Sequence, residues 1–160
     1  MSDPDPDPDP QPALDVITRS MVMKAPRAKV WAALTDHVAF GTWFRVALDG
    51  PFVVGAMSRG QITYPGAEHL RFEALVVAIE PPTRFALRWH PFPIDPAADY
   101  GAEPMTLVEF TLADEPGGTR VTVTESGFAG IPAHRRGPAF DANSHGWTLQ
   151  LDNLAAHVAG

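Results

Sequence analysis

The C-terminal segment constrains the fold of this chain more than any other, because its apolar residues follow the period of an α-helix. Phe140, Trp147, Leu151, Leu154 and Val158 recur at steps of seven, four, three and four. These steps place the five side chains along one stripe of a helix over Pro138 to Val158. Such a stripe packs on an apolar surface, so the rest of the chain must provide one.

The segment between Leu14 and Ser126 reads mostly as short alternating strands. Strands are predicted over 15–23, 56–64, 70–79, 84–90, 106–112 and 120–126. Two short helices are expected between the first two strands, one opened by Ala25-Pro26 and one capped by Thr35-Asp36. Glu115-Pro116-Gly117-Gly118 is a hairpin signal between the last two strands.

This order predicts an α+β fold in which a curved antiparallel sheet wraps a long C-terminal helix. Such an arrangement forms around a cavity, and the cavity is the main functional prediction of the sequence. Residues 91–104 form a proline-bearing insertion between two strands, and connections of this length are often functional.

Composition excludes several classes of function. The formal net charge of −7 argues against a general nucleic-acid binder, and the adjacent Arg135 and Arg136 are expected in a solvated loop. The absence of cysteine excludes disulfides, thiolate zinc sites and a cysteine nucleophile. No apolar run is long enough to span a membrane and no secretion signal is present, so we expect a cytoplasmic protein.

The N-terminus differs from the rest of the chain. Residues 3–12 repeat Asp-Pro four times and end in Gln-Pro. Proline excludes both helix and ladder strand there, so residues 1–13 are expected to be a disordered tail. Residues 14–160 are then expected to form a single domain.

Several landmarks, in this order, resemble the START-like or SRPBCC superfamily, and most closely its branch named after the activator of the Hsp90 ATPase. They are the segments 25–36, Trp43-Phe44, Glu80-Pro81-Pro82-Thr83-Arg84-Phe85 with Trp89, 119–128, and Gly146-Trp147 with Leu151 and Leu154. The resemblance covers nearly all of Leu14 to Val158.

The resemblance implies a helix-grip fold with about six or seven strands around the C-terminal helix. Members of the superfamily bind hydrophobic ligands, transfer lipids, cyclise polyketides or assist a chaperone. They share no catalytic set of residues, so the resemblance assigns no catalytic residue here.

Candidate ligand-binding residues are large or polar groups expected to face inward from helix and sheet. They are Trp43, Phe44, Met57, Trp89, Phe128, Phe140, Asn143 and Trp147. For any one of the aromatic residues, simple filling of the core is the commoner role.

Asn143 stands out because it falls on the apolar stripe of the last helix. A buried amide needs partners, and a ligand oxygen, a strand carbonyl or a trapped water would each serve. Gly146 removes a side chain in mid-helix, which either close packing on the sheet or room for a ligand would explain.

No metal site, cofactor or nucleotide motif is predicted. The six histidines include no metal-binding spacing, and the serines lack a nucleophile-elbow context. His90 would act as a general base only with a carboxylate to orient it, for which Asp95 and Asp99 are candidates.

We therefore favour a module that binds a small hydrophobic or amphipathic molecule over an enzyme. Two alternatives remain open. A polyketide cyclase or dehydratase would use the same cavity with a polar residue such as Asn143, His90 or Arg45. A protein that interacts with a chaperone would instead present an exposed apolar patch outside the cavity.

Overall fold

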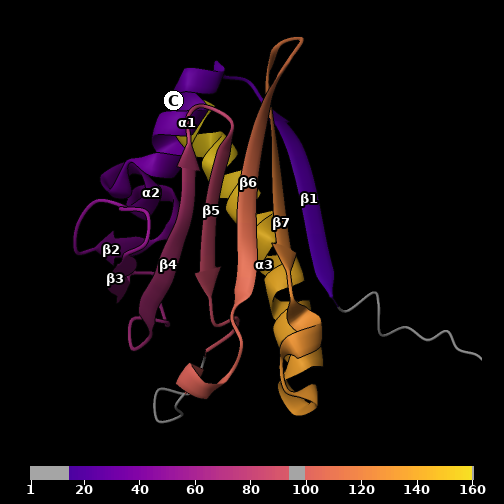
Figure 1. Cartoon of the computed structure of the whole chain (residues 1–160). Helices are drawn as coiled ribbons and strands as arrows, with labels where there is room; N and C mark the ends of the chain where they lie inside the picture. Colours follow the sequence, from indigo (N-terminus) through magenta and orange to yellow (C-terminus); the bar gives the residue numbers. More distant parts are fainter. Residues whose placement is uncertain (1–14, 94–99, 160) are drawn as a thin grey trace, which may run out of the picture.

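One seven-stranded antiparallel sheet, covered on one face by a long helix, makes up most of the computed structural model (Figure 1). The structure describes residues 15–93 and 100–159. The predicted Asp-Pro tail and the carboxylates of Asp95 and Asp99 lie outside these residues.

The strands are β1 (Val16–Met23), β2 (Val46–Leu48), β3 (Met57–Ile62), β4 (Arg71–Glu80), β5 (Arg84–Trp89), β6 (Thr106–Glu115) and β7 (Gly118–Ser126). The α-helices are α1 (Arg27–Thr35), α2 (His37–Phe44) and α3 (Ala133–Ala159), and the short 3₁₀ helices are η2 (Tyr100–Ala102) and η3 (Phe128–Gly130).

The order of the strands across the sheet is β1-β7-β6-β5-β4-β3-β2. Each strand from β2 onward pairs with its sequence neighbour, while β1 pairs with β7, so the two short helices connect one edge of the sheet to the other. The predicted helix-grip fold is confirmed. The three-residue strand β2 is too short to show a period in the sequence and was not predicted separately.

Individual residues mark the ends of the two short helices. Pro26 precedes α1, and Asp36 caps α2 by accepting a hydrogen bond at 2.9 Å from the backbone nitrogen of Ala39. Arg45 ends α2 in the left-handed region, with φ of 72°. The chain reverses there. Phe44 ends α2, which contacts α3, and Val46 begins β2 at the edge of the sheet.

The long helix α3 begins earlier than the sequence predicted. It starts at Ala133 and continues through Pro138, so Arg135 and Arg136 lie in its first turns and not in a solvated loop. That expectation was wrong because both guanidinium groups have partners in the folded chain. Arg136 donates to the carbonyl oxygens of Phe128 and Ile131, and these contacts hold the first turns in place.

The predicted apolar stripe of α3 packs on the inner face of the sheet. Trp147, Leu151, Leu154 and Val158 are all at most 3 % exposed, and Phe140 is half-buried. No helix among the described residues is long and apolar enough to cross a membrane.

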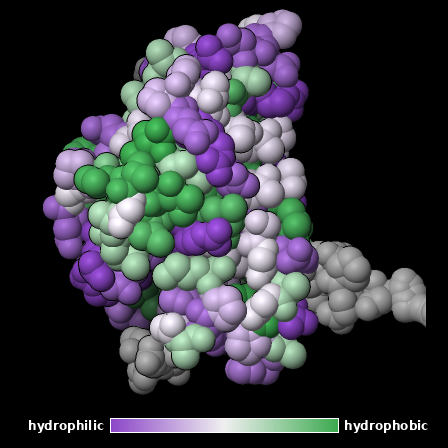
Figure 2. Space-filling model, in the orientation of Figure 1, coloured by the Kyte–Doolittle hydropathy of each residue, from purple (hydrophilic) through white to green (hydrophobic). Residues whose placement is uncertain are grey.

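The outer face of the sheet carries apolar side chains as well. Val53 and Val54, in the connection before β3, are 58 % and 54 % exposed, and Met57 and Leu75 are half-buried partners across β3 and β4. Figure 2 shows apolar residues gathered over this part of the face turned away from α3. We call Val53, Val54, Met57 and Leu75 the outer patch.

An ion pair on β5 and β6 has a marked electrostatic effect. Arg84 donates hydrogen bonds at 2.9 and 2.7 Å to the carboxylate of Glu109. This hydrogen bonding to the Glu109 carboxylate raises the pKa of Arg84 above its ordinary value.

Candidate ligand-binding site

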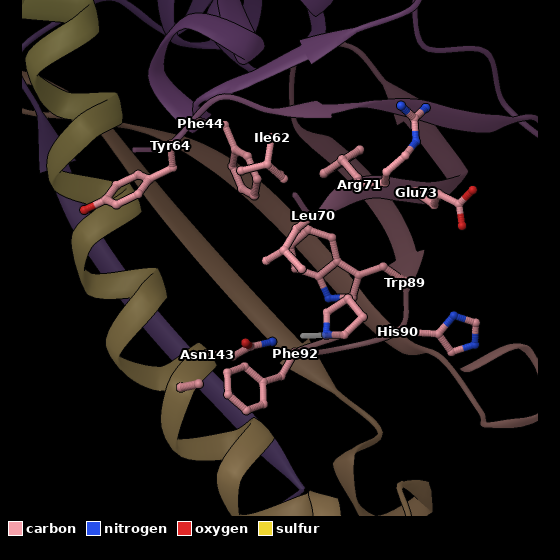
Figure 3. A pocket seen from close by; sticks show the side chains of 13 residues that line it. Phe44, Ile62, Tyr64, Leu70, Arg71, Glu73, Trp89, His90, Phe92 and Asn143 are labelled. Atoms are coloured by element: carbon pink, nitrogen blue, oxygen red, sulfur yellow. The ribbon is translucent and has the colours of Figure 1, made fainter. Parts of the chain in front are cut away.

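A cavity of about 520 Å³ lies between the sheet and α3. Its wall comes from the end of α2, from β3 and β4, from the end of β5 and from the middle of α3 (Figure 3). The lining residues are Phe44, Ile62, Tyr64, Leu70, Arg71, Phe72, Glu73, Trp89, His90, Phe92, Pro93, Ala142 and Asn143. Most of these residues are apolar, and the volume is in the range of small-molecule sites in proteins.

A smaller cavity of about 120 Å³ shares part of this wall. It is lined by Phe44, Trp89, Asn143, Gly146, Trp147 and Gln150. Three residues, Phe44, Trp89 and Asn143, line both cavities. They form the boundary between the two spaces, so a shift of any one of them changes both.

A buried carboxylate supports this boundary. Glu125 on β7 is fully buried and accepts hydrogen bonds from the indole nitrogens of Trp89 and Trp147, both at 2.8 Å. It also accepts from the hydroxyl of Thr106 at 2.6 Å and from the amide nitrogen of Asn143 at 3.0 and 3.2 Å. All four partners are donors, which suits an ionised carboxylate because its oxygens only accept.

This network fixes the two indoles that face the cavities. The rings of Trp89 and Trp147 are stacked with centroids 5.7 Å apart and an angle of 14° between their planes. Each ring has one polar atom, and Glu125 binds both of these atoms. The rest of each indole is apolar, and the ring centroid of Phe44 lies within 6.4 Å of both indole centroids.

Four of the predicted ligand-binding residues come together here. Phe44, Trp89 and Asn143 line the larger cavity, and Trp147 lines the smaller one. They come from α2, β5 and α3, which are far apart in the sequence. Whether a ligand contacts them stays a prediction.

The other four lie outside the walls of these two cavities. They are Trp43, Met57, Phe128 and Phe140. Trp43 is buried, and its indole nitrogen donates to the carbonyl of Ala33 at 2.9 Å between α1 and α2. Phe128 and Phe140 pack on each other with ring centroids 5.2 Å apart, and Met57 belongs to the outer patch.

The partner of Asn143 is now identified. Its amide nitrogen donates to Glu125, a side chain of the sheet, which was not among the partners that the sequence suggested. Gly146 is explained by space and not by close packing. A Cβ added there would meet no heavy atom within 4 Å, and the residue lines the smaller cavity.

A second polar contact holds the segment that closes one side of the larger cavity. Arg135 donates to the carbonyl oxygens of Pro91 and Phe92, both at 2.9 Å, and to the carboxylate of Glu103 at 2.9 and 3.0 Å. Its guanidinium also lies 4.7 Å from the ring centroid of Tyr100. Arg135 therefore ties the start of α3 to Phe92, a residue of the cavity wall.

The remaining polar candidates have other surroundings. The ring nitrogen Nε2 of His90 lies 3.0 Å from the carbonyl oxygen of Glu103, and Figure 3 shows the ring directed away from Asn143. Arg45 is exposed and lies over the ring of Tyr64, 5.8 Å from its centroid. The described residues contain no group of three or more histidine, aspartate or glutamate side chains that could hold a metal ion.

Sequence reasoning missed Glu125 as a member of the site. A signal was present, since Val121 and Val123 alternate along the last strand and the same period places residue 125 on the inner face. A glutamate at such a position demands partners, because an unpaired buried charge is very unfavourable. Those partners come from two other strands and α3, and the sequence does not show which ones.

The family model of activator of Hsp90 ATPase homolog 1-like proteins matches residues 24–159. The chain belongs to this family. The match covers α1 to α3, which includes all of the residues that line the two cavities. No curated protein matches the chain.

Several solved structures share the fold of this chain. DynU16, a protein in the dynemicin biosynthetic locus, is 26 % identical with a TM-score of 0.71 over 95 % of this chain, which spans only 48 % of DynU16. MLL2253 from Mesorhizobium loti is 24 % identical with a TM-score of 0.70 over 90 % of this chain and 96 % of its own. CalU16 from Micromonospora echinospora is 22 % identical with a TM-score of 0.59 over 89 % of this chain and 74 % of its own.

Proposed function

We propose that this family member binds a small apolar or amphipathic molecule in the cavity between the sheet and α3. The observation that carries the proposal is the cavity of about 520 Å³, whose wall is mostly apolar and includes Asn143 as an interior polar group. A cavity of this size can hold a small organic molecule. Burial of the apolar surface of that molecule would drive binding.

The arrangement of the wall supports binding more than catalysis. Glu125, the buried carboxylate next to the cavity, already accepts hydrogen bonds from four donors. A carboxylate held in this way anchors side chains and has little capacity left to take a proton from a ligand. The polyketide cyclase alternative therefore gains no support from the geometry.

Thermal shift with a panel of apolar molecules tests the proposal, with dynemicin included because a structural relative comes from its biosynthetic locus. A ligand present at a hundred times its dissociation constant should raise the free energy of unfolding by about 2.7 kcal/mol. The decisive variant is Ala142→Phe, because Ala142 lines the cavity and a phenyl ring there would fill it.

The matched control is Ala156→Phe, which adds the same ring at an exposed position of the same helix. We expect Ala142→Phe to abolish the shift produced by the ligand and Ala156→Phe to keep it. A shift that both variants keep would place binding elsewhere. A complete lack of shift across a broad panel would remove the proposal.

A second candidate function is favoured by one observation, the outer patch. Val53 and Val54 of this patch are more than half exposed, and Figure 2 shows apolar surface on the face that α3 does not cover, as expected for a surface that contacts another protein. The family name suggests the chaperone Hsp90 as the first partner to examine. Calorimetric titration of Hsp90 with the wild-type protein and with Val53→Lys/Val54→Lys tests this candidate, and heat of binding that the double variant loses would support it.

A further inference from the structure

We propose that the ligand of the larger cavity carries an uncharged hydrogen-bond donor, a hydroxyl or an N–H group, that binds the amide oxygen of Asn143. This inference rests on the proposed function, because it assumes that the cavity is a binding site. It goes further by naming the polar group of the ligand and the atom that recognises it.

The network around Glu125 fixes the orientation of the Asn143 amide. Both oxygens of the carboxylate lie close to the amide nitrogen, at 3.0 and 3.2 Å. A carboxylate oxygen accepts and cannot donate, so the nitrogen must face Glu125 and the amide cannot rotate by 180°. The amide oxygen Oδ1 is therefore held on the side away from the carboxylate.

The cavity is the space that this oxygen can face. Asn143 lines both cavities, and Figure 3 shows its side chain beside the space bounded by Leu70, Trp89 and Phe92, with the amide nitrogen on the side of Trp89 and the amide oxygen on the side of α3. No hydrogen bond to Oδ1 is found from any residue that the structure describes. Leu70 and Phe92, which bound this space, have wholly apolar side chains.

An acceptor in an apolar wall selects a donor on the ligand. A ligand that fills the cavity displaces water from Oδ1, and an acceptor left without a partner then lowers the affinity. A hydroxyl or N–H group on the ligand restores the lost hydrogen bond. An ether or a carbonyl at the same place does not, because it too is an acceptor.

Charge further narrows the class of ligand. A carboxylate on the ligand near Asn143 would meet a second acceptor, with the buried carboxylate of Glu125 just behind it. Arg71, although it lines the cavity, extends away from Asn143 in Figure 3, and its guanidinium lies 3.9 Å from Asp49. The site therefore favours alcohols, phenols and neutral N–H compounds over fatty acids and other carboxylates.

Three probes of similar size separate these groups. We would measure the affinities of 2-naphthol, 2-methoxynaphthalene and 2-naphthoate for the full chain by isothermal titration calorimetry at pH 7. The first has a donor, the second only an ether acceptor, and the third a negative charge. One hydrogen bond predicts that 2-naphthol binds roughly 3- to 10-fold tighter than 2-methoxynaphthalene. We expect 2-naphthoate to bind most weakly.

A substitution at the recognising atom provides the second arm. Asn143→Leu removes Oδ1 and keeps a side chain of similar size, so the preference for 2-naphthol over 2-methoxynaphthalene should disappear. This variant also removes a donor to Glu125, and its fold must be checked by circular dichroism. The comparison of probes on the wild-type protein decides the inference even if the variant does not fold.

The outcomes distinguish this inference from the proposed function. Equal binding of 2-naphthol and 2-methoxynaphthalene would overturn the donor preference and leave the cavity as a binding site. Tightest binding of 2-naphthoate would overturn it as well. Failure of all three probes, together with a silent thermal-shift panel, would overturn the proposed function itself.

Discussion

Glu125 is the residue on which the geometry of the candidate site depends most. It is fully buried on the mostly apolar inner face of the sheet, and its four donors come from β5, β6 and α3. A buried charge of this kind is retained only when its partners satisfy it. Two of these partners, Trp89 and Asn143, also form the boundary between the two cavities.

We predict that Glu125→Gln lowers the free energy of unfolding by about 1–3 kcal/mol. An amide replaces one carboxylate oxygen by a donor, which then faces other donors such as the indole nitrogens of Trp89 and Trp147. Urea denaturation followed by tryptophan fluorescence measures the loss. The emission of the folded variant should also change, since both indoles lose a fixed hydrogen-bond partner.

Ser58 provides a matched control because it is also a buried polar residue of the sheet. Its hydroxyl oxygen is buried and has no hydrogen-bond partner, unlike the oxygens of Glu125. Ser58→Ala removes an unsatisfied polar group and should leave stability unchanged or slightly raised. If Ser58→Ala proves as destabilising as Glu125→Gln, the hydrogen bonds to Glu125 are not what makes that position sensitive.

At the scale of elements, the start of α3 and the end of β5 act as one unit. Arg135 in the first turns of α3 binds the backbone of Pro91 and Phe92 and pairs with Glu103. The side chains of Arg135 and Glu103 are only 14 % and 17 % exposed. The contact is therefore shielded from water, and it contributes more than an exposed ion pair would.

We predict that Arg135→Met lowers the free energy of unfolding by about 3 kcal/mol, because it leaves a largely buried Glu103 without its partner. Methionine keeps the apolar stem of the side chain and removes only the guanidinium. The segment over residues 88–93 should exchange its amide hydrogens faster, which mass spectrometry of peptides from this region measures.

The neighbouring arginine is the control for this prediction. Arg136 donates to the carbonyl oxygens of Phe128 and Ile131. These two residues lie in η3 and between η3 and α3, outside the cavity wall. Arg136→Met should therefore destabilise the start of α3 without faster exchange over residues 88–93. Equal exchange in both variants would show that Arg135 does not hold Phe92 in place.

At the scale of the whole molecule, the core and the cavity occupy different parts of the space between the sheet and α3. The last turns of α3, with Leu151, Leu154 and Val158, pack as solid core. The middle of the helix, around Ala142 and Asn143, faces the cavity. Stability and binding should therefore respond to different substitutions along one helix.

We predict that Leu154→Ala lowers the free energy of unfolding by about 2–5 kcal/mol, since the side chain is fully buried and its loss leaves a void. The dissociation constant of a ligand found by thermal shift should stay within about twofold of the wild-type value. Denaturation and calorimetry on the same variant check both halves. A large change in affinity would mean that core and cavity are mechanically coupled.

The sequence by itself determined the elements and their order. Apolar period along residues 140–158, alternation in residues such as Phe85 and Leu87, and the turn Pro116-Gly117 are local signals, and they report local backbone geometry. The resemblance to a known family then connected these elements into a helix-grip fold. Fold and family could therefore be predicted before any contact was known.

Only the tertiary structure decided which side chains share the site. Glu125 contacts Trp89, Thr106, Asn143 and Trp147 across separations of 36, 19, 18 and 22 residues, and no local period encodes such pairings. The same holds for Arg135, whose partners lie 32 to 44 residues away in the sequence. Contact with these partners leaves the Arg135 side chain largely buried. A sequence shows which face a side chain takes, whereas the packed sheet and helix decide what it meets there.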